Sequence, residues 1–184
     1  MIGPGYPTRD GDVESVLHAL GRVGEQVVVD ADALNHLARR REPWAGWAGA
    51  GKVLTPHPGE AARLLRCFTE DVQSDRFGAV ERLVAASGAV CVLKGAYTLV
   101  GSPDGGAWVC PAGNQGMATA GSGDVLSGVI GALLARGLDP FMAAVAGVYW
   151  HGRAGDLAMH QRGENALRAR DLIDALSDVE KLVC

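Results

Sequence analysis

The chain has 184 residues, of which 48% are hydrophobic and 21% charged, and its formal net charge is −4. This length and balance suit one globular domain with a sizeable core, so we expect residues 1–184 to form a single domain. The slight negative charge gives no electrostatic basis for binding nucleic acid or a membrane surface. The apolar runs 125–134 and 141–150 are each too short to span a membrane, which predicts core helices.

The four cysteines, Cys67, Cys91, Cys110 and Cys184, lack the spacing of a disulfide framework or a zinc site. We therefore expect reduced thiols and a cytoplasmic location. The first residues show no basic region followed by an apolar core, so a signal peptide is not expected.

Predicted helices and strands alternate along the chain. Helical spacing is found at 13–20, 33–40, 60–66 and 76–87, and strand-like runs lie at 26–30, 52–55 and 89–93. Residues 97–100 and 107–110 flank the turn-forming segment 102–106 and predict a β-hairpin. Two long helices follow, and a helix over 169–176 closes the chain. The alternation predicts an α/β fold, with a largely parallel sheet covered by helices on both faces and an antiparallel hairpin added.

Polar residues lie at or just after the ends of several predicted strands. In parallel sheets, ligands bind beside the carboxyl ends of the strands. Four candidates occupy such places: Asp30, His57, Lys94 and Asp124.

The segment Gly113–Asp124 is rich in small residues and leads directly into an apolar helical pattern. Small residues let the backbone approach a ligand closely, and a helix N-terminus attracts anions. We therefore expect the ligand to be a phosphate. A carboxylate there, Asp124, suggests proton removal from a hydroxyl and therefore phosphoryl transfer. Two other interpretations remain: a flexible connection for the loop, and helix capping for Asp124.

The remaining candidates each have a structural alternative. His57 lies between two prolines, where it either contacts a ligand or has a structural role. Lys94 either contacts a phosphate or is an ordinary surface lysine. The run 30–35 could form a helix cap, with Asp32 as the capping residue. His151 and His160 are interpreted as packing or surface residues.

Several motifs stand in the order and spacing of one protein family. They are Asp30–Asn35, Leu54–Glu60, Lys94–Gly95, Gly113–Ala118, Gly121–Leu126, Gly147–Gly152, Ala154–Asp156 and Gly163–Glu164. Together they cover nearly the whole chain, and they resemble the ADP/ATP-dependent NAD(P)H-hydrate dehydratases, which are ribokinase-like proteins. The resemblance implies a ribokinase-like three-layer fold.

The resemblance also implies a repair reaction and a set of site residues. NADH or NADPH hydrated at C6 of the nicotinamide would be phosphorylated on its 6-hydroxyl and then lose phosphate, which is a carbon–oxygen lyase reaction. Asp124 would accept the hydroxyl proton, and the N–H groups of Gly121, Ser122 and Gly123 would hold the phosphoryl charge. Mg²⁺ would accompany the nucleotide phosphates, although no residue cluster identifies its protein ligands.

The remaining implied contacts fall into two groups. Residues implied to bind ADP or ATP are Lys94, Gly95, Ala96, Tyr97, Thr98, Asn114, Gln115, Gly116, Met117, Ala118, Thr119, Ala120, Gly121, Ser122 and Gly123. Residues implied to bind the hydrated dinucleotide are Gly5, Asn35, His57, Pro58, Gly59, Glu60 and Asp124.

The sequence departs from the family pattern mainly at its start. Members carry an N-terminal portion before the Ile2–Gly5 motif that supplies early strands, so we expect those strands to be missing here and the first strand to have an unpaired edge. That edge favours a homo-oligomer. Tyr6-Pro7, Ala120 and Ser122 are smaller departures, and none removes Asp124.

Two other functions remain open. A small-molecule kinase of the same fold, acting on a vitamin-precursor alcohol, would share Gly123-Asp124 but has no need for the Thr55–Glu60 motif. A catalytically silent nucleotide-binding subunit is the alternative that the shortened start suggests.

Overall fold

The computed structural model describes residues 1–5, 26–39 and 51–183. The predicted helix over 13–20 and the Tyr6-Pro7 departure lie outside the described residues. None of the described helices is both long enough and apolar enough to cross a membrane.

The centre of the molecule is a five-stranded sheet whose strands follow the order of the chain. Its strands are β1 (Val27–Val29), β2 (Lys52–Leu54), β3 (Val90–Leu93), β4 (Leu99–Gly101) and β5 (Ala107–Val109). Strands β1, β2 and β3 are parallel, whereas β4 and β5 form an antiparallel hairpin beside β3. This topology confirms the predicted parallel run with an added hairpin.

Apolar residues on both faces of the parallel strands explain why these runs show no alternation of polar and apolar positions. Val27 and Val29 belong to a core with the helices on one face, and Val28 belongs to the core on the other face. β-branched residues favour the extended backbone, and burial of both faces makes a continuous apolar strand stable.

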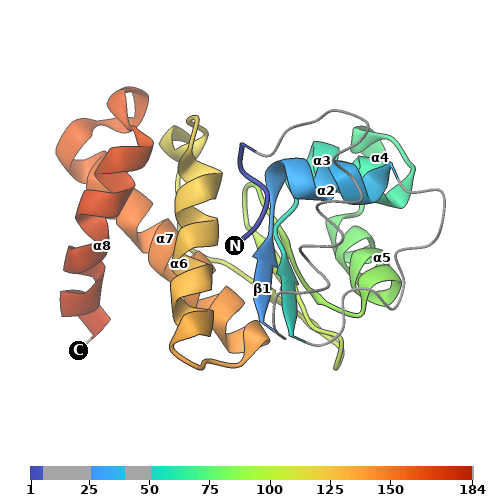
Figure 1. Ribbon diagram of the computed structural model, residues 1–184. Helices are drawn as coiled ribbons and strands as arrows, with labels where there is room; N and C mark the ends of the chain where they lie inside the picture. Colours follow the sequence, from blue (N-terminus) through green and yellow to red (C-terminus); the bar gives the residue numbers. More distant parts are fainter. Residues whose placement is uncertain (6–25, 40–50, 184) are drawn as a thin grey trace.

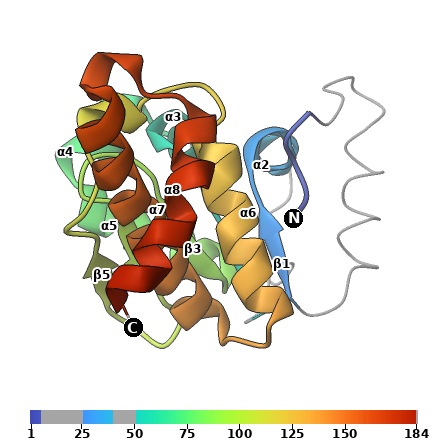
Figure 2. The ribbon, with the colours of Figure 1, turned by 90° about the vertical axis from the view of Figure 1, so that its left-hand side faces the viewer.

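Helices cover both faces of the sheet, as Figures 1 and 2 show. On one face lie α2 (Ala31–Ala38), α3 (Pro58–Leu65), α4 (Thr69–Ser74) and α5 (Arg76–Ser87). On the other lie α6 (Ser122–Ala135) and α7 (Pro140–Arg162), and α8 (Ala169–Val183) packs outside them through a separate apolar cluster with α7. The three-layer arrangement was predicted from the sequence and is confirmed.

Several element bounds differ from the prediction. Helix α3 begins at Pro58 because His57 caps it and proline is tolerated in the first turn. Helix α4 was not predicted, since only Val72 among its six residues is buried and an apolar period is absent. Helices α7 and α8 are longer than predicted, because tertiary packing extends their apolar faces beyond the segments with clear periodicity.

The outer edge of β1 is bonded to the first residues of the chain. The Ile2 N–H donates to the Val28 carbonyl at 2.8 Å, and the Asp30 N–H donates to the Ile2 carbonyl at 3.0 Å. Gly3 has a φ of +139°, and a Cβ there would collide with the Asp30 carbonyl. The edge that was expected to be unpaired is therefore paired at one position, where only glycine lets the chain pass.

Candidate functional site

Residues that follow the three parallel strands meet at one end of the sheet. Asp30 follows β1, Thr55 follows β2 and Lys94 follows β3. Asp30 is buried, and its Oδ1 accepts from Lys94 Nζ at 2.8 Å while its Oδ2 accepts from Ser127 Oγ of α6 at 2.6 Å. The Ser127 hydroxyl also lies 3.3 Å from Thr55 Oγ1. A buried polar network therefore joins the strand ends to α6.

Lys94 is not the surface lysine of the alternative interpretation. Its side chain is 19% exposed, and its Nζ lies 2.8 Å from Asp30 Oδ1 and 3.8 Å from Glu60 Oε2. A Cβ built on Gly123 would lie 3.3 Å from the same nitrogen. The ammonium group is thus held between two mostly buried carboxylates and the first turn of α6, where it adds positive charge.

His57 forms the cap of α3. Its Nδ1 accepts from the N–H groups of Gly59 at 3.0 Å and Glu60 at 3.3 Å, and Glu60 Oε2 accepts from the His57 N–H at 2.8 Å. This reciprocal capping box satisfies donors that the first turn would leave unpaired. The side chain is 49% exposed, so a structural role leaves part of the ring open to a ligand.

The charges around this turn favour a neutral imidazole. Burial, followed by the positive charges of Lys94 and Arg63, lowers the pKa of His57. Burial raises the pKa of Glu60, and Lys94 opposes that effect. A neutral ring is what the cap needs, because protonated Nδ1 could no longer accept the two N–H groups.

The N-terminus of α6 is open to a ligand. Gly121 is its N-cap with a φ of +84°, a conformation that favours glycine, and it supplies no capping side chain. The Ser122 N–H donates to the Thr119 carbonyl at 3.3 Å, whereas within the described residues the N–H groups of Gly121 and Gly123 have no partner. These groups and the helix dipole favour negative charge at this position.

Asp124 lies in the first turn of α6 and is exposed. Its carboxylate makes no hydrogen bond or ion pair within the described part of the chain, and it does not cap the helix. Asp124 is therefore not the N-cap residue, although its carboxylate in the first turn suits the helix dipole, as the capping alternative assumes. Asp30 rather than Asp32 caps α2, because Asp32 lies inside the first turn.

Helix α7 holds the glycine-rich loop in place. Asp156 accepts from the Gly113 N–H and from Asn114 Nδ2, each at 3.2 Å. A Cβ on Gly152 would lie 2.9 Å from the Ala112 carbonyl oxygen, and a Cβ on Gly155 would collide with Met117. Small residues on this face of α7 let the loop approach the helix closely.

His151 connects α7 to the start of α6. It is buried, and its Nε2–H donates to the Ser122 carbonyl oxygen at 3.0 Å. Burial lowers the pKa of His151 to about 4, so the ring is neutral at physiological pH. His160 is exposed, and both histidines fit the packing and surface roles predicted for them.

Arg76 of α5 holds the start of the loop between β3 and β4. Arg76 Nη2 donates to the carbonyl oxygens of Leu93 at 3.2 Å and Lys94 at 3.4 Å. Within the loop, Tyr97 has a φ of +52° and is 73% exposed. This backbone conformation is uncommon for an aromatic residue. The exposed ring is available to a ligand.

The structure brings together only part of the expected substrate group. His57, Gly59 and Glu60 lie with Lys94 near Asp30. Asn35 Oδ1 instead accepts from Arg63 Nη1 at 2.8 Å, further along α3, and Gly5 is exposed beyond the Ile2 pairing.

Sequence reasoning missed Arg63, Arg76 and Ser127, which help to organise the site, and it named Thr55 and Asp156 only as members of motifs, with no role of their own. Thr55 could have been found from its place directly after a strand. Arg63, Arg76 and Ser127 interact with residues distant in the sequence, and no local signal identifies them.

Across the described residues, no group of three or more His, Cys, Asp or Glu side chains is arranged to hold a metal ion.

Comparisons with known proteins agree with this geometry. A family model described as NAD(P)H-hydrate dehydratase matches residues 1–178. The bifunctional NAD(P)H-hydrate repair enzyme Nnr of Moorella thermoacetica is 49% identical over 175 residues, which are 95% of this chain and 33% of that protein. The chain thus spans about a third of the length of this curated relative.

Two solved structures share the fold. The ADP/ATP-dependent NAD(P)H-hydrate dehydratase from Bacillus subtilis, co-crystallized with ATP/Mg²⁺, has a TM-score of 0.86 and 35% identity over 98% of this chain and 63% of that chain. A ribokinase-like superfamily protein from Enterococcus faecalis has a TM-score of 0.80 and 25% identity over 98% of this chain and 62% of that chain. The fold is ribokinase-like, as predicted, and the chain belongs to the NAD(P)H-hydrate dehydratase family.

Proposed function

We propose that this chain restores hydrated NADH or NADPH by dehydration, with ADP or ATP as the phosphoryl donor. One observation carries the proposal: the exposed carboxylate of Asp124 stands in the same helical turn as the N–H groups of Gly121 and Gly123, and none of these groups has a partner among the described residues. A base beside an anion site is the arrangement that phosphoryl transfer to a hydroxyl requires. The family to which the chain belongs supports the hydrated dinucleotide as the alcohol.

The residues at the start of α6 fit the phosphates of a nucleotide. Glycines at 121 and 123 leave room for a phosphate to reach the backbone, and Lys94 Nζ lies beside Gly123. Asp156 holds the loop that would line the rest of the nucleotide. A Mg²⁺ ion would be held mainly through the nucleotide phosphates, and it would neutralise part of their charge. The related Bacillus subtilis protein was co-crystallized with ATP/Mg²⁺.

The proposed reaction has two steps. Asp124 accepts the proton of the 6-hydroxyl while that oxygen attacks the terminal phosphorus of the nucleotide, so ADP becomes AMP, or ATP becomes ADP. The C6–O bond then breaks with loss of inorganic phosphate, and a proton leaves C5 to form the C5=C6 double bond. No oxidant or reductant is needed, because the ring is dehydrated and not oxidised.

The remaining groups of the site stabilise charge on the phosphoryl group or position the substrate. Lys94 and the α6 N–H groups stabilise negative charge on the transferring phosphoryl group. The capped turn from His57 to Glu60 lies on the α3 side of Lys94, where it would contact the dinucleotide. We also propose a cytoplasmic location, which the free thiols of Cys67, Cys91 and Cys110 support.

Turnover is tested with purified protein, hydrated NADH or NADPH, and ADP or ATP, by following the recovery of dihydronicotinamide absorbance. We expect recovery with the wild-type chain. Asp124→Asn should lower the rate at least about 100-fold while nucleotide binding persists, because only the base is lost. Asp104→Asn, at an exposed turn of the hairpin, is the matched control and should retain full activity.

Other outcomes favour the alternatives. Phosphorylation of a vitamin-precursor alcohol without recovery of either dinucleotide would identify a small-molecule kinase. Binding of nucleotide without any turnover would identify a silent subunit. Full activity in Asp124→Asn would remove Asp124 from the role of base.

A further inference from the structure

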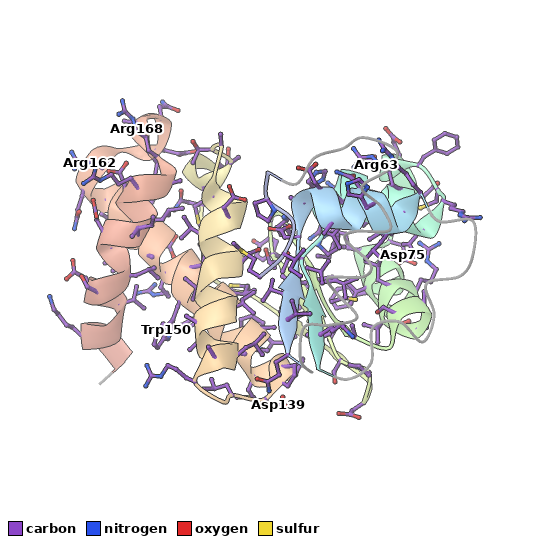
Figure 3. The ribbon with its side chains drawn as sticks, in the orientation of Figure 1. Arg63, Asp75, Asp139, Trp150, Arg162 and Arg168 are labelled. Atoms are coloured by element: carbon purple, nitrogen blue, oxygen red, sulfur yellow. The ribbon has the colours of Figure 1, made fainter. Side chains whose placement is uncertain are left out.

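A pocket of about 480 Å³ opens between α2 and α3, and Asp124 is not among its described lining residues. We call it the arginine pocket, because its lining consists of Asn35, Ala38, Arg39 and Arg63. Asn35 and Arg39 are four residues apart and face the same side of α2, and Arg63 faces them from α3. Figure 3 shows Arg63 beside α2, at the end of the molecule where α6 begins.

The lining offers positive charge and hydrogen-bond donors. Arg63 Nη1 donates to Asn35 Oδ1 at 2.8 Å, which occupies the amide oxygen and leaves the amide N–H groups for a ligand. None of the described residues that line the pocket carries a carboxylate. A second pocket on α5 differs, because Asp75 and Glu81 line it together with Arg82. Planar guanidinium groups are suited to phosphate oxygens, which they can bind in pairs.

The arginine pocket continues the surface that begins at the His57 turn. Arg63 follows Gly59 by one helical turn, and its Nη2 would lie 3.9 Å from a Cβ on Gly59. Its charge also reaches the site, since it contributes to lowering the pKa of His57. A long substrate whose reacting ring lies near Asp124 and His57 therefore has cationic surface further along.

We propose that the arginine pocket binds a phosphate group of the hydrated dinucleotide, with Arg63 and Arg39 as the charged contacts. This inference rests on the proposed function. The dinucleotide has two sources of such a group, the pyrophosphate common to NADH and NADPH and the 2′-phosphate of NADPH alone. Binding there fixes the far part of the substrate and leaves the chemistry to Asp124.

A negative charge introduced at position 38 tests this proposal without removing any side chain that now lines the pocket. Ala38→Glu and Ala38→Gln add side chains of the same size, and only the first adds a negative charge. We expect Ala38→Glu to raise the KM for the hydrated dinucleotide at least tenfold above that of Ala38→Gln, with kcat and the KM for ADP little changed. Arg63→Gln should raise the same KM, whereas Arg82→Gln on the second pocket should not.

A comparison of NADH hydrate with NADPH hydrate distinguishes the pyrophosphate from the 2′-phosphate as the group bound in the pocket. A higher KM for NADPH hydrate alone assigns the pocket to the 2′-phosphate, and a higher KM for both hydrates assigns it to the pyrophosphate. An unchanged KM for both hydrates in Ala38→Glu and Arg63→Gln overturns the inference.

Binding of NADPH and NADH themselves tests the arginine pocket independently of the dehydratase activity. These dinucleotides carry the same phosphates as the hydrates, and their binding needs no turnover. If the wild-type chain binds NADPH, and Ala38→Glu weakens that binding at least tenfold relative to Ala38→Gln, the pocket is supported even when no hydrate is turned over. Turnover with equal NADPH binding by both variants supports the dehydratase and rejects the pocket.

Discussion

The ion pair between Lys94 and Asp30 joins the ends of β3 and β1 at the centre of the candidate site. Asp30 is 1% exposed, so its charge must be matched by close partners. The Lys94 ammonium supplies the opposite charge, while Ser127 and the Ala31 N–H supply further hydrogen bonds. Loss of one partner would leave a buried carboxylate whose desolvation is no longer offset.

We expect Lys94→Met to lower the free energy of unfolding by about 3 kcal/mol, because it leaves Asp30 without its counter-charge. Adding Asp30→Asn to this variant should restore at least about 1 kcal/mol, since the amide keeps hydrogen bonds but no charge. Urea denaturation of the two single variants and the double variant measures this coupling. Strictly additive effects would contradict the pairing.

His151 makes stability depend on pH. Its pKa in the folded protein is about 4, below the usual value of 6.5, so the unfolded chain binds the proton more tightly. Its contribution to stability is therefore fully present above about pH 6.5 and declines as pH falls toward 4. The direction is set mainly by burial of the ring.

Between pH 7 and pH 5 we expect this residue to remove about 2 kcal/mol from the free energy of unfolding. His151→Gln keeps a donor for the Ser122 carbonyl but does not titrate, so its stability should fall less over the same range. Urea unfolding at several pH values gives the difference between the two proteins. Parallel pH profiles for both would show that the His151 pKa is not lowered.

At the scale of elements, close approach of helices is what forms the site. Helix α7 contacts α6 through Gly147, where a Cβ would lie 2.6 Å from Ile130 Cγ1 and 3.4 Å from the Ile130 backbone. The same helix holds the glycine-rich loop through Gly152, Gly155 and Asp156. A shift of α7 would therefore move both the start of α6 and the loop.

We expect Gly147→Ala to lower the free energy of unfolding by about 1–3 kcal/mol, because the added methyl group overpacks the α6–α7 contact. Gly128→Ala is the matched change on α6, where a Cβ meets nothing within 4 Å. It should raise stability by about 0.5–1 kcal/mol through reduced backbone freedom of the unfolded chain. Thermal and urea unfolding compare them, and a stabilising Gly147→Ala would refute the close contact.

At the scale of the whole molecule, the sheet places both halves of the site at one end. Parallel strands bring Asp30, Thr55 and Lys94 together, and helices on opposite faces supply the two binding surfaces. Helix α6 presents the anion site from one face, while α2 and α3 present the His57 turn and the arginine pocket from the other. The groups that we propose to react therefore meet across the strand ends.

The hydrogen bonds between Ile2 and the outer edge of β1 should affect the stability and self-association of the whole fold. We expect Gly3→Ala to lower stability by about 2 kcal/mol, because the collision with the Asp30 carbonyl breaks the two Ile2 hydrogen bonds. An opened strand edge also pairs readily with other chains, so self-association should increase. Urea unfolding and sedimentation velocity measure both effects. Unchanged stability would show that Ile2 contributes little.

Local patterns predicted much of the fold. Helix α5 has the predicted bounds, and β2, β3 and the hairpin lie where β-branched residues and turn residues indicated. The motif Pro56–Glu60 and the element Gly121–Asp124 pointed to the family that the comparisons show. These signals are local, because backbone preference and close approach to phosphate depend on neighbouring residue types.

The sequence by itself determined the alternation of elements, the family and the position of the carboxylate Asp124. Only the tertiary structure decided which partners the charged groups have. Lys94 and Asp30 are 64 positions apart, Ser127 and Asp30 are 97 apart, and Arg63 and Asn35 are 28 apart. Such contacts depend on strand register and helix packing, and no local pattern encodes them. The loop still indicates phosphate chemistry, but the pairing of Lys94 with Asp30 sets the charge beside it.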